Sequence, residues 1–438
     1  MKINIITLGC SKNTVDSENL GGHFAAAGHK VYYDREQNDC DVVLLNTCGF
    51  IGDAKEQSID AILAEVERKR NYNRRHHADQ RQRKLVVFGC LVQRYREELR
   101  QELPDVDAWF GVHEWEAIMT YCAISAAPLA EQRLLSTPRH YAYLKISEGC
   151  NRACSYCAIP LIRGKHVSRP IDDLVAEARG LVAKGTRELI LIAQDTTYYG
   201  VDLYGRRCLG ELLERLANES GADWIRLHYT YPTSFPIDAV DVMRRHDNIC
   251  NYIDIPLQHI NSRILGSMQR GIDREGTLAL LKHFREQLPD VCIRTTLIVG
   301  YPGETDEDFE ELKQFVAEAR FDRMGCFAYS PEEGTPAESL GDPISQEVKE
   351  QRVEALMAVQ EAISLAKNEA RVGTECKVLV DRCEGDCYVA RSEYDSPDVD
   401  DEILIFTDQK LAIGDFVTVR ITQALEHDLY GEVLAQDL

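Results

Sequence analysis

The sequence predicts an α/β protein with three successive parts: a parallel sheet covered by helices, an incomplete β/α barrel, and a small five-stranded antiparallel barrel. Three observations predict this order. Residues 1–125 alternate short apolar runs with helical patterns, and a second such series begins after Pro138. Beyond residue 374 the pattern changes to short strands separated by turn residues. We therefore expect domains at residues 1–125, 136–370 and 374–438.

The first part has the alternation that is typical of a Rossmann-like parallel sheet. Its expected strands are Ile3–Thr7, Asp41–Leu45, Leu85–Phe88 and Ala108–Phe110. Helical patterns lie near Val15–Ala27, Asp53–Arg68 and Leu91–Glu102. A polar stretch, Arg68–Lys84, interrupts the series, and residues 126–138 form a weakly patterned linker.

The second part contains six candidate strands with helical patterns between them. They are Tyr141–Ile146, Glu188–Ala193, Trp224–Thr230, Tyr252–Ile255, Cys292–Val299 and Arg323–Tyr329. Six β/α units are fewer than the eight of a full barrel, so we expect a partial (β/α)6 barrel. A long helical pattern, Gln346–Arg371, connects it to the third part.

The third part reads as a small barrel of the OB-like kind. Its expected strands are Glu375–Asp381, Tyr388–Arg391, Glu402–Phe406, Asp415–Ile421 and Glu432–Leu434.

Composition limits the class of protein. The chain has a net charge of −22, and a uniformly acidic surface repels nucleic acid. No window of 18 apolar residues exists, so we expect no membrane span. The opening run MKINIITLGC reads as a buried strand and not as a signal peptide, which predicts a cytoplasmic protein. In a reducing compartment, 15 cysteines indicate metal binding or catalysis more than disulfides.

Three cysteines, Cys150, Cys154 and Cys157, follow the first strand of the expected barrel. Thiolates hold iron–sulfur clusters, usually four to a [4Fe–4S] cube, so three would leave one iron open to a small molecule. The loop lies at the C-terminal rim, where barrel active sites are built. The alternatives are a zinc site, which more often uses two separated C-x2-C pairs, or unrelated core cysteines.

This spacing, with Tyr156 before the last cysteine, resembles the radical S-adenosylmethionine (SAM) superfamily. The resemblance implies that SAM binds the open iron and is cleaved by one electron to a 5′-deoxyadenosyl radical, which abstracts hydrogen from the substrate. An electron donor such as flavodoxin or ferredoxin is implied as well. Residues at the same rim are candidates for holding SAM, although each could be a simple turn or strand end. These candidates are Tyr156, Gln194, Asp195, Tyr229, Gln258, Gly300 and Glu304.

A second set of cysteines, Cys10, Cys48 and Cys90, follows three strands of the N-terminal sheet. Open parallel sheets bind ligands beyond the carboxyl ends of their strands, so these thiols could share a cluster. They could equally be small buried apolar residues. The runs LGCSKNTVDSE, LLNTCGFI and FGC resemble the N-terminal domain of the methylthiotransferase family, and the resemblance extends through a C-terminal TRAM barrel.

The resemblance to that family implies two [4Fe–4S] clusters and two SAM molecules per turnover. Cys150, Cys154 and Cys157 would hold the cluster that cleaves SAM, and Cys10, Cys48 and Cys90 the cluster that carries the sulfur. One SAM would methylate that sulfur, and the substrate carbon radical would then take the methylthio group.

The family has one branch that modifies adenosine in tRNA and another that modifies the β-carbon of an aspartate in ribosomal protein twelve of the small subunit. Ser11-Lys12-Asn13 and residues 46–51, 253–259, 390–392 and 395–400 resemble the second branch. Residues 374–438 carry five basic and sixteen acidic residues, which favours a basic protein over RNA as partner. The partner would be ribosomal protein twelve, free or on the ribosome, and tRNA is not expected.

One feature points the other way. Arg68–Lys84 holds eight basic residues and one acid, and it could touch ribosomal RNA or be a solvated helix end and loop. The family pattern has no such insertion. Two alternative functions are therefore kept: a tRNA adenosine methylthiotransferase, and a non-catalytic iron–sulfur RNA-binding or sensor protein.

Overall fold

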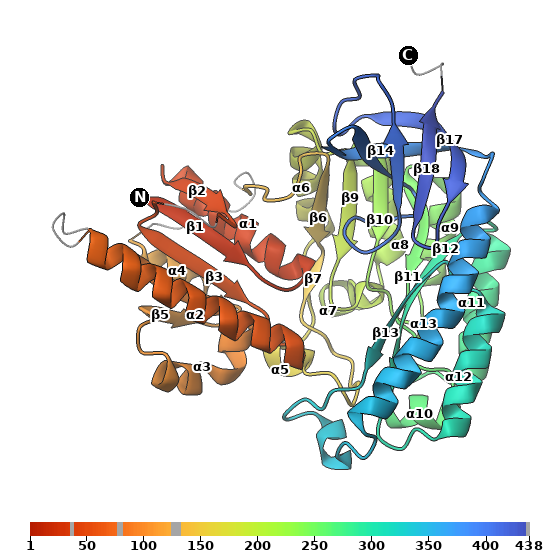
Figure 1. The fold of residues 1–438 in the computed structure, drawn as a ribbon, viewed down its shortest axis with the longest axis horizontal. Helices are drawn as coiled ribbons and strands as arrows, with labels where there is room; N and C mark the ends of the chain where they lie inside the picture. Colours follow the sequence, from red (N-terminus) through yellow and green to blue (C-terminus); the bar gives the residue numbers. More distant parts are fainter. Residues whose placement is uncertain (36–38, 77–81, 124–132, 435–438) are drawn as a thin grey trace. The chain divides into compact units, whose positions relative to one another are not determined.

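The structure is a computed structural model that describes residues 1–35, 39–76, 82–123 and 133–434 (Figure 1). The chain forms two compact units. The N-terminal unit consists of Met1–Thr137, Glu148–Arg152 and Ala158–Val167. The main unit consists of Pro138–Ser147, Ala153–Cys157 and Ser168–Leu438. Parts of the expected linker and of the basic stretch, residues 126–132 and 77–81, lie outside the described residues.

The N-terminal unit is built on a five-stranded, wholly parallel sheet in the order β2-β1-β3-β4-β5. Its strands are β1 (Lys2–Thr7), β2 (Lys30–Tyr33), β3 (Val42–Thr47), β4 (Lys84–Gly89) and β5 (Ala108–Phe110). The sequence pattern missed β2. This strand lies at the sheet edge and buries none of its four residues fully, so it lacks the apolar run that marks the other strands.

Helices cover both faces of this sheet. They are α1 (Ser11–Ala26), α2 (Gly52–Arg75), α3 (Cys90–Glu102), α4 (Trp115–Tyr121) and the short α5 (Ile159–Arg163). Leu44 packs with α1 and α4 on one face, while its neighbours Val43 and Leu45 pack with α2 and α3 on the other. Alternation of side chains between two covered faces explains why β3 is apolar throughout.

Helix α2 is longer than expected and carries the first part of the basic stretch. Lys69 forms an ion pair with Asp107 at 2.5 Å, and Arg70 pairs with Asp105. Arg68 also pairs with Glu65 at 2.5 Å. These ion pairs within the unit favour a solvated helix end over a nucleic-acid surface.

The main unit contains the predicted partial barrel, a parallel sheet in the order β13-β12-β11-β10-β9-β6. Its strands are β6 (Tyr141–Lys145), β9 (Glu188–Ile192), β10 (Trp224–Leu227), β11 (Ile249–Asp254), β12 (Cys292–Val299) and β13 (Arg323–Ala328). The long helices are α6 (Ile171–Ala183), α8 (Leu209–Glu219), α9 (Ile237–Arg245), α11 (Arg274–Gln287), α12 (Asp306–Ala319) and α13 (Gln346–Glu369). Asp273 and Thr305 cap α11 and α12 by accepting backbone N–H groups.

Short elements complete this part. They are η3 (Thr196–Tyr198), α7 (Val201–Tyr204), α10 (Ser262–Ser267) and η4 (Pro336–Leu340). Two further short strands, β7 (Ser147–Glu148) and β8 (Val167–Ser168), form a two-stranded sheet.

The C-terminal part is a closed five-stranded barrel in the order β14-β15-β16-β18-β17. Its strands are β14 (Glu375–Glu384), β15 (Cys387–Ser392), β16 (Glu402–Phe406), β17 (Phe416–Ala424) and β18 (Asp428–Val433). The predicted five-stranded barrel is confirmed, and its pairs are antiparallel except for β16 and β18, which pair in parallel. Directions cannot alternate all the way around a closed ring with an odd number of strands, so one neighbouring pair has to be parallel.

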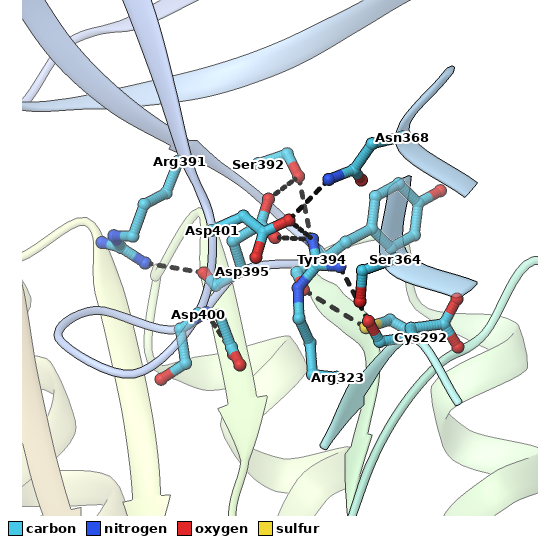
Figure 2. A network of polar contacts seen from close by, with 12 residues as sticks. Cys292, Arg323, Ser364, Asn368, Arg391, Ser392, Tyr394, Asp395, Asp400 and Asp401 are labelled. Carbon is cyan, nitrogen blue, oxygen red and sulfur yellow. Dashed lines mark hydrogen bonds and ion pairs between the residues drawn. The ribbon is translucent and has the colours of Figure 1, made fainter. Parts of the chain in front are cut away.

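The C-terminal barrel covers the amino ends of the partial-barrel strands (Figure 1). The loop between β15 and β16 reaches these ends through buried polar contacts, shown in Figure 2. Arg391 on β15 donates to Glu188 on β9 at 2.9 Å, and Arg226 on β10 donates to the same carboxylate at 2.7 Å. Because barrel active sites lie at the opposite, carboxyl ends, this domain leaves that rim uncovered.

Candidate functional site

In the N-terminal unit, three cysteines follow three adjacent strands of the sheet. Cys10 comes after β1, Cys48 after β3, and Cys90 begins α3 directly after β4. With the order β2-β1-β3-β4-β5, the crevice of an open parallel sheet lies beyond the carboxyl ends of β1 and β3. Cys10 is exposed, whereas Cys48 and Cys90 are buried.

The three thiols influence one another electrostatically. Burial raises the pKa of Cys90 to about 11, and the nearby Cys10 and Cys48 add to this rise while Arg163 opposes it. Burial also raises the pKa of Cys48, with Cys10 again contributing. The structure places the three predicted residues just past the ends of the adjacent strands β1, β3 and β4.

The loops that carry these thiols are packed closely. Gly9 has a φ of 93°, and a Cβ at this position would lie 2.8 Å from Cys48 Cβ and 3.0 Å from its sulfur. Only glycine fits both the backbone conformation and the space. Ser58 Oγ accepts a hydrogen bond from the Cys48 amide at 3.0 Å and so fixes the second loop from α2.

Asn13 joins the loops of this set. Its buried side-chain amide donates to Leu8 O at 2.7 Å, before Cys10, and to Thr47 O at 3.3 Å, before Cys48. Its Oδ1 lies 3.7 Å from Cys90 Sγ. One side chain therefore contacts all three cysteine-bearing strand ends. The sequence singles out Ser11-Lys12-Asn13 only by family resemblance and does not predict this role for Asn13.

Sequence reasoning missed Arg163, which ends α5 in the same unit. Its guanidinium is buried and donates from Nη2 to Cys90 Sγ at 3.4 Å and to Asn13 Oδ1 at 2.5 Å. Its Nη1 donates to Asp16 at 2.7 Å. A cation six residues beyond Cys157 carries no sequence signal of its own, because the contact with Cys90 joins positions 73 residues apart.

The second cysteine motif is a loop whose two ends belong to different units. In the N-terminal unit, the Cys150 amide donates to Gly164 O at 3.1 Å, and the Arg152 amide donates to Cys150 Sγ at 3.4 Å. In the main unit, the Cys157 amide donates to Cys154 O at 3.2 Å. The loop follows β6, at the carboxyl rim that the sequence predicts.

Cys154 has polar neighbours that the sequence did not reveal. Its sulfur lies 3.4 Å from the Tyr231 hydroxyl, and Arg270 Nη1 donates to it at 3.5 Å. Arg270 also donates to the Tyr156 hydroxyl at 3.3 Å and stacks over the Tyr231 ring at 4.1 Å. Burial raises the pKa of Tyr156 well above its usual value, against the opposing effect of Arg270. The candidate Tyr156 is therefore a neutral hydrogen-bonding group beside the cysteine loop.

Four other SAM candidates lie just past strand ends at the rim. Gln194 and Asp195 follow β9, Tyr229 follows β10, and Gln258 follows β11. Tyr229 and Gln258 have positive φ angles of 55° and 74°, and the Tyr229 amide donates to Asp254 at 2.8 Å. Non-glycine residues held in this conformation are often functional, which keeps both as candidates.

Gly300 and Glu304 share a turn after β12. The Gly300 amide donates to Glu304 Oε2 at 2.9 Å, and Arg352 on α13 donates to Glu304 Oε1 at 2.7 Å. Burial raises the pKa of Glu304. These contacts give the carboxylate a structural task in the turn, and a contact with SAM stays a prediction.

The cysteines of each set lie on loops, and their side chains are not arranged as a complete set of metal ligands. Within the described ranges, no three His, Cys, Asp or Glu side chains are arranged to hold a metal ion. The donor chemistry nevertheless fits an iron–sulfur cluster, because each set offers three thiols and a cationic donor that stabilises a thiolate, Arg163 at Cys90 and Arg270 at Cys154.

Comparison with known proteins places these features in a family. The chain matches the models of the uncharacterized protein family UPF0004 at residues 2–111, the Radical SAM superfamily at 144–316, and the TRAM domain at 372–434. It is 51% identical over 435 residues to the ribosomal protein uS12 methylthiotransferase RimO of Cytophaga hutchinsonii, covering 99% of this chain and 98% of that one. The RimO of Flavobacterium psychrophilum is 53% identical over 437 residues, covering 98% of each chain. The chain belongs to the RimO family.

Solved structures agree on the fold. The radical SAM methyltransferase TsrM from Kitasatospora setae, with cobalamin and a [4Fe–4S] cluster bound, has a TM-score of 0.55 at 13% identity and covers 89% of this chain and 80% of its own. The cobalamin-dependent SAM radical enzyme OxsB, with SAM bound, has a TM-score of 0.52 at 9% identity, covering 82% and 56%.

Membership of the RimO family confirms the expected chemistry. The chain is a radical SAM methylthiotransferase, an enzyme that uses an iron–sulfur cluster and SAM. The expectation of a catalytic protein, and not a sensor, is confirmed. Among the helices in the described ranges, none is both long and apolar enough to cross a membrane.

Proposed function

We propose that this enzyme adds a methylthio group to the β-carbon of an aspartate in ribosomal protein uS12. The observation that supports the proposal is that Cys10, Cys48 and Cys90 follow three adjacent strands whose ends are joined by Asn13, in a chain that also has the Cys150–Cys157 loop. A radical SAM enzyme that only abstracts hydrogen needs one cluster, whereas sulfur insertion needs a second place to hold sulfur. The names of the RimO relatives supply the substrate.

In this proposal two [4Fe–4S] clusters are bound, one by each cysteine set, within functional domains at residues 1–125, 136–370 and 374–438. When bound, the clusters and SAM supply the sulfur, the methyl group and the one-electron chemistry. The chain supplies thiolates, hydrogen bonds and exclusion of water. Arg270 stabilises the Cys154 thiolate as a donor, and three thiolates leave one position of the cluster for SAM.

The surface of the C-terminal barrel supports a basic protein partner. Of the acidic side chains in the described part of residues 374–438, eight are exposed, against four exposed basic ones. Two exposed arginines are already paired: Arg382 with Glu402 at 2.6 Å, and Arg420 with Glu375 at 2.6 Å. An acidic surface attracts the basic chains of most ribosomal proteins and repels RNA phosphates. An electron donor such as flavodoxin or ferredoxin, and recognition of uS12 on the ribosome, belong to the proposal.

The test compares cells with and without the gene. Intact masses of small-subunit ribosomal proteins and a survey of tRNA nucleosides are measured from the same lysates, with a Cys154→Ala strain as the inactive control. We expect uS12 to gain one methylthio group in place of one hydrogen only when the intact gene is present. An unchanged uS12, with loss of a methylthioadenosine instead, would overturn the substrate.

A further inference from the structure

One buried cation lies against the N-terminal cysteine set. Arg163 is 3% exposed, and its Nη2 donates to Cys90 Sγ at 3.4 Å and to Asn13 Oδ1 at 2.5 Å. Its other end is held by Asp16 at 2.7 Å and Glu148 at 3.2 Å. Carboxylates on one side and a sulfur on the other fix the guanidinium in one orientation, with a donor directed at Cys90.

The contact makes the three cysteines unequal. Cys90 receives a charged donor from Arg163. Cys48 has the backbone amides of Gly49 and Phe50 as neighbours, which are neutral donors. Cys10 is exposed to solvent. Any group bound by the three sulfurs would therefore have a charged hydrogen-bond donor beside one of its three ligands.

We propose that Arg163 is a positioning residue that raises the reduction potential of the cluster held by Cys10, Cys48 and Cys90. This inference rests on the proposed function, since it requires that cluster. Hydrogen bonds to cluster sulfurs, nearby charge and burial set the potentials of iron–sulfur centres. Reduction adds one negative charge, and a fixed cation 3.4 Å from a ligand sulfur stabilises the reduced state more than the oxidised one.

The experiment uses the full chain with Cys150, Cys154 and Cys157 all replaced by Ala, so that only the N-terminal cluster gives a signal. After anaerobic reconstitution, iron and sulfide are counted, and the reduction potential is measured by an EPR-monitored titration. The variants are Arg163→Met, which removes charge and donors, Arg163→Gln, which keeps a neutral donor, and Arg163→Lys, which keeps the charge. Arg100→Met is the matched control, because Arg100 is exposed and its ion pair is with Glu97 at 3.8 Å.

We expect Arg163→Met to lower the equilibrium constant for one-electron reduction about tenfold, which is about 59 mV for one electron. The reduction potential of Arg163→Gln should be nearly as low as that of Arg163→Met. The potential of Arg163→Lys should be close to that of the parent, and the potential of Arg100→Met should be the same as that of the parent. A merely structural role would change cluster content without this ordering by charge.

The outcomes separate the two proposals. A parent that binds no iron overturns the second cluster and the inference with it. A parent that binds a cluster whose potential is the same in Arg163→Met and Arg100→Met overturns the inference alone. If Arg163→Met does not fold or load, Arg163→Lys and Arg163→Gln decide, because equal potentials in these two would refute an effect of charge.

Discussion

Arg323 on β13 and Asp395 in the C-terminal barrel form a buried ion pair at 2.6 Å (Figure 2). Asp401 approaches the same guanidinium at 3.1 Å, and Ser392 donates to Asp395 at 2.5 Å. The pair therefore joins the amino end of β13, a strand of the partial barrel, to the loop between β15 and β16. The C-terminal barrel and the partial barrel belong to the same compact unit.

Removing the cation of this pair should destabilise the main unit. In Arg323→Met, Asp395 would remain as a buried carboxylate without its ion partner, which costs about 3–5 kcal/mol of unfolding free energy. Arg420→Met removes a cation whose partner Glu375 is half exposed, and should cost about 0–1 kcal/mol. Chemical denaturation of both variants measures the difference. Equal losses would show that the interface contributes no more than the surface pair.

Asp401 should make stability depend on pH. Burial raises the pKa of Asp401 to about 6, against the attraction of Arg323. A carboxyl with a raised folded pKa contributes stability that is complete below its unfolded pKa, near 3.8, and lost as the pH rises through about 6. The unfolding free energy should fall by up to about 3 kcal/mol over this range, at 1.36 kcal/mol per pKa unit.

Asp401→Asn should remove this pH dependence. The unfolding free energy of the variant should therefore rise relative to that of the wild type between pH 4 and pH 7. Unfolding free energies of both proteins across this range measure it. Asp395 has a lowered pKa, mainly through Arg323 acting against burial, and its opposite contribution is lost only at lower pH. A constant difference between variant and wild type across the range would contradict the prediction.

The two cysteine sets should have separable tasks. Cys154→Ala should abolish reductive cleavage of SAM, because it removes a thiolate from the motif that resembles the radical SAM signature. Cys48→Ala should leave cleavage but stop sulfur insertion, because Cys48 belongs to the other set. 5′-Deoxyadenosine and methylthio product are measured separately for each variant. Loss of cleavage in a folded Cys48→Ala protein would refute this division.

Gly9→Ala should damage the N-terminal cysteine set more than a glycine substitution elsewhere in the unit. Both Gly9 and Gly28 have positive φ angles, 93° and 81°. A Cβ at Gly9 would meet Cys48, while one at Gly28 would meet nothing within 4 Å. Gly28→Ala therefore pays only the backbone cost, about 1–2 kcal/mol. Iron content of both variants is the measurement, and equal content would argue against crowding at Cys48.

Much of the N-terminal site followed from the sequence. Cys10, Cys48 and Cys90 each follow a strand pattern, and the carboxyl ends of parallel strands meet at one sheet edge, so their convergence was predictable. Asn13 and Arg163 were not. Their roles depend on contacts between residues that are distant along the chain, and neither periodicity nor spacing reports such contacts.

In the acidic C-terminal part, the composition overestimated the surface charge. Its sequence charge suggested an acidic surface, yet Asp395 and Asp401 are buried, where they bind Arg323. The remaining exposed acids still exceed the exposed bases, so the argument for a basic partner holds with less charge than the composition suggested. Composition counts charges, and only folding decides which of them are neutralised inside.

The sequence by itself predicted the order of the three parts and the two cysteine sets, because strand and helix periodicity and ligand spacing are local properties. The radical SAM character was implied by the resemblance of its cysteine motif to that superfamily. The tertiary structure decided the edge strand β2, the parallel pair β16–β18, the cation at Cys90 and the docking of the C-terminal barrel on Arg323. These features arise from contacts between distant segments, whose free energy is defined only when the chain is folded.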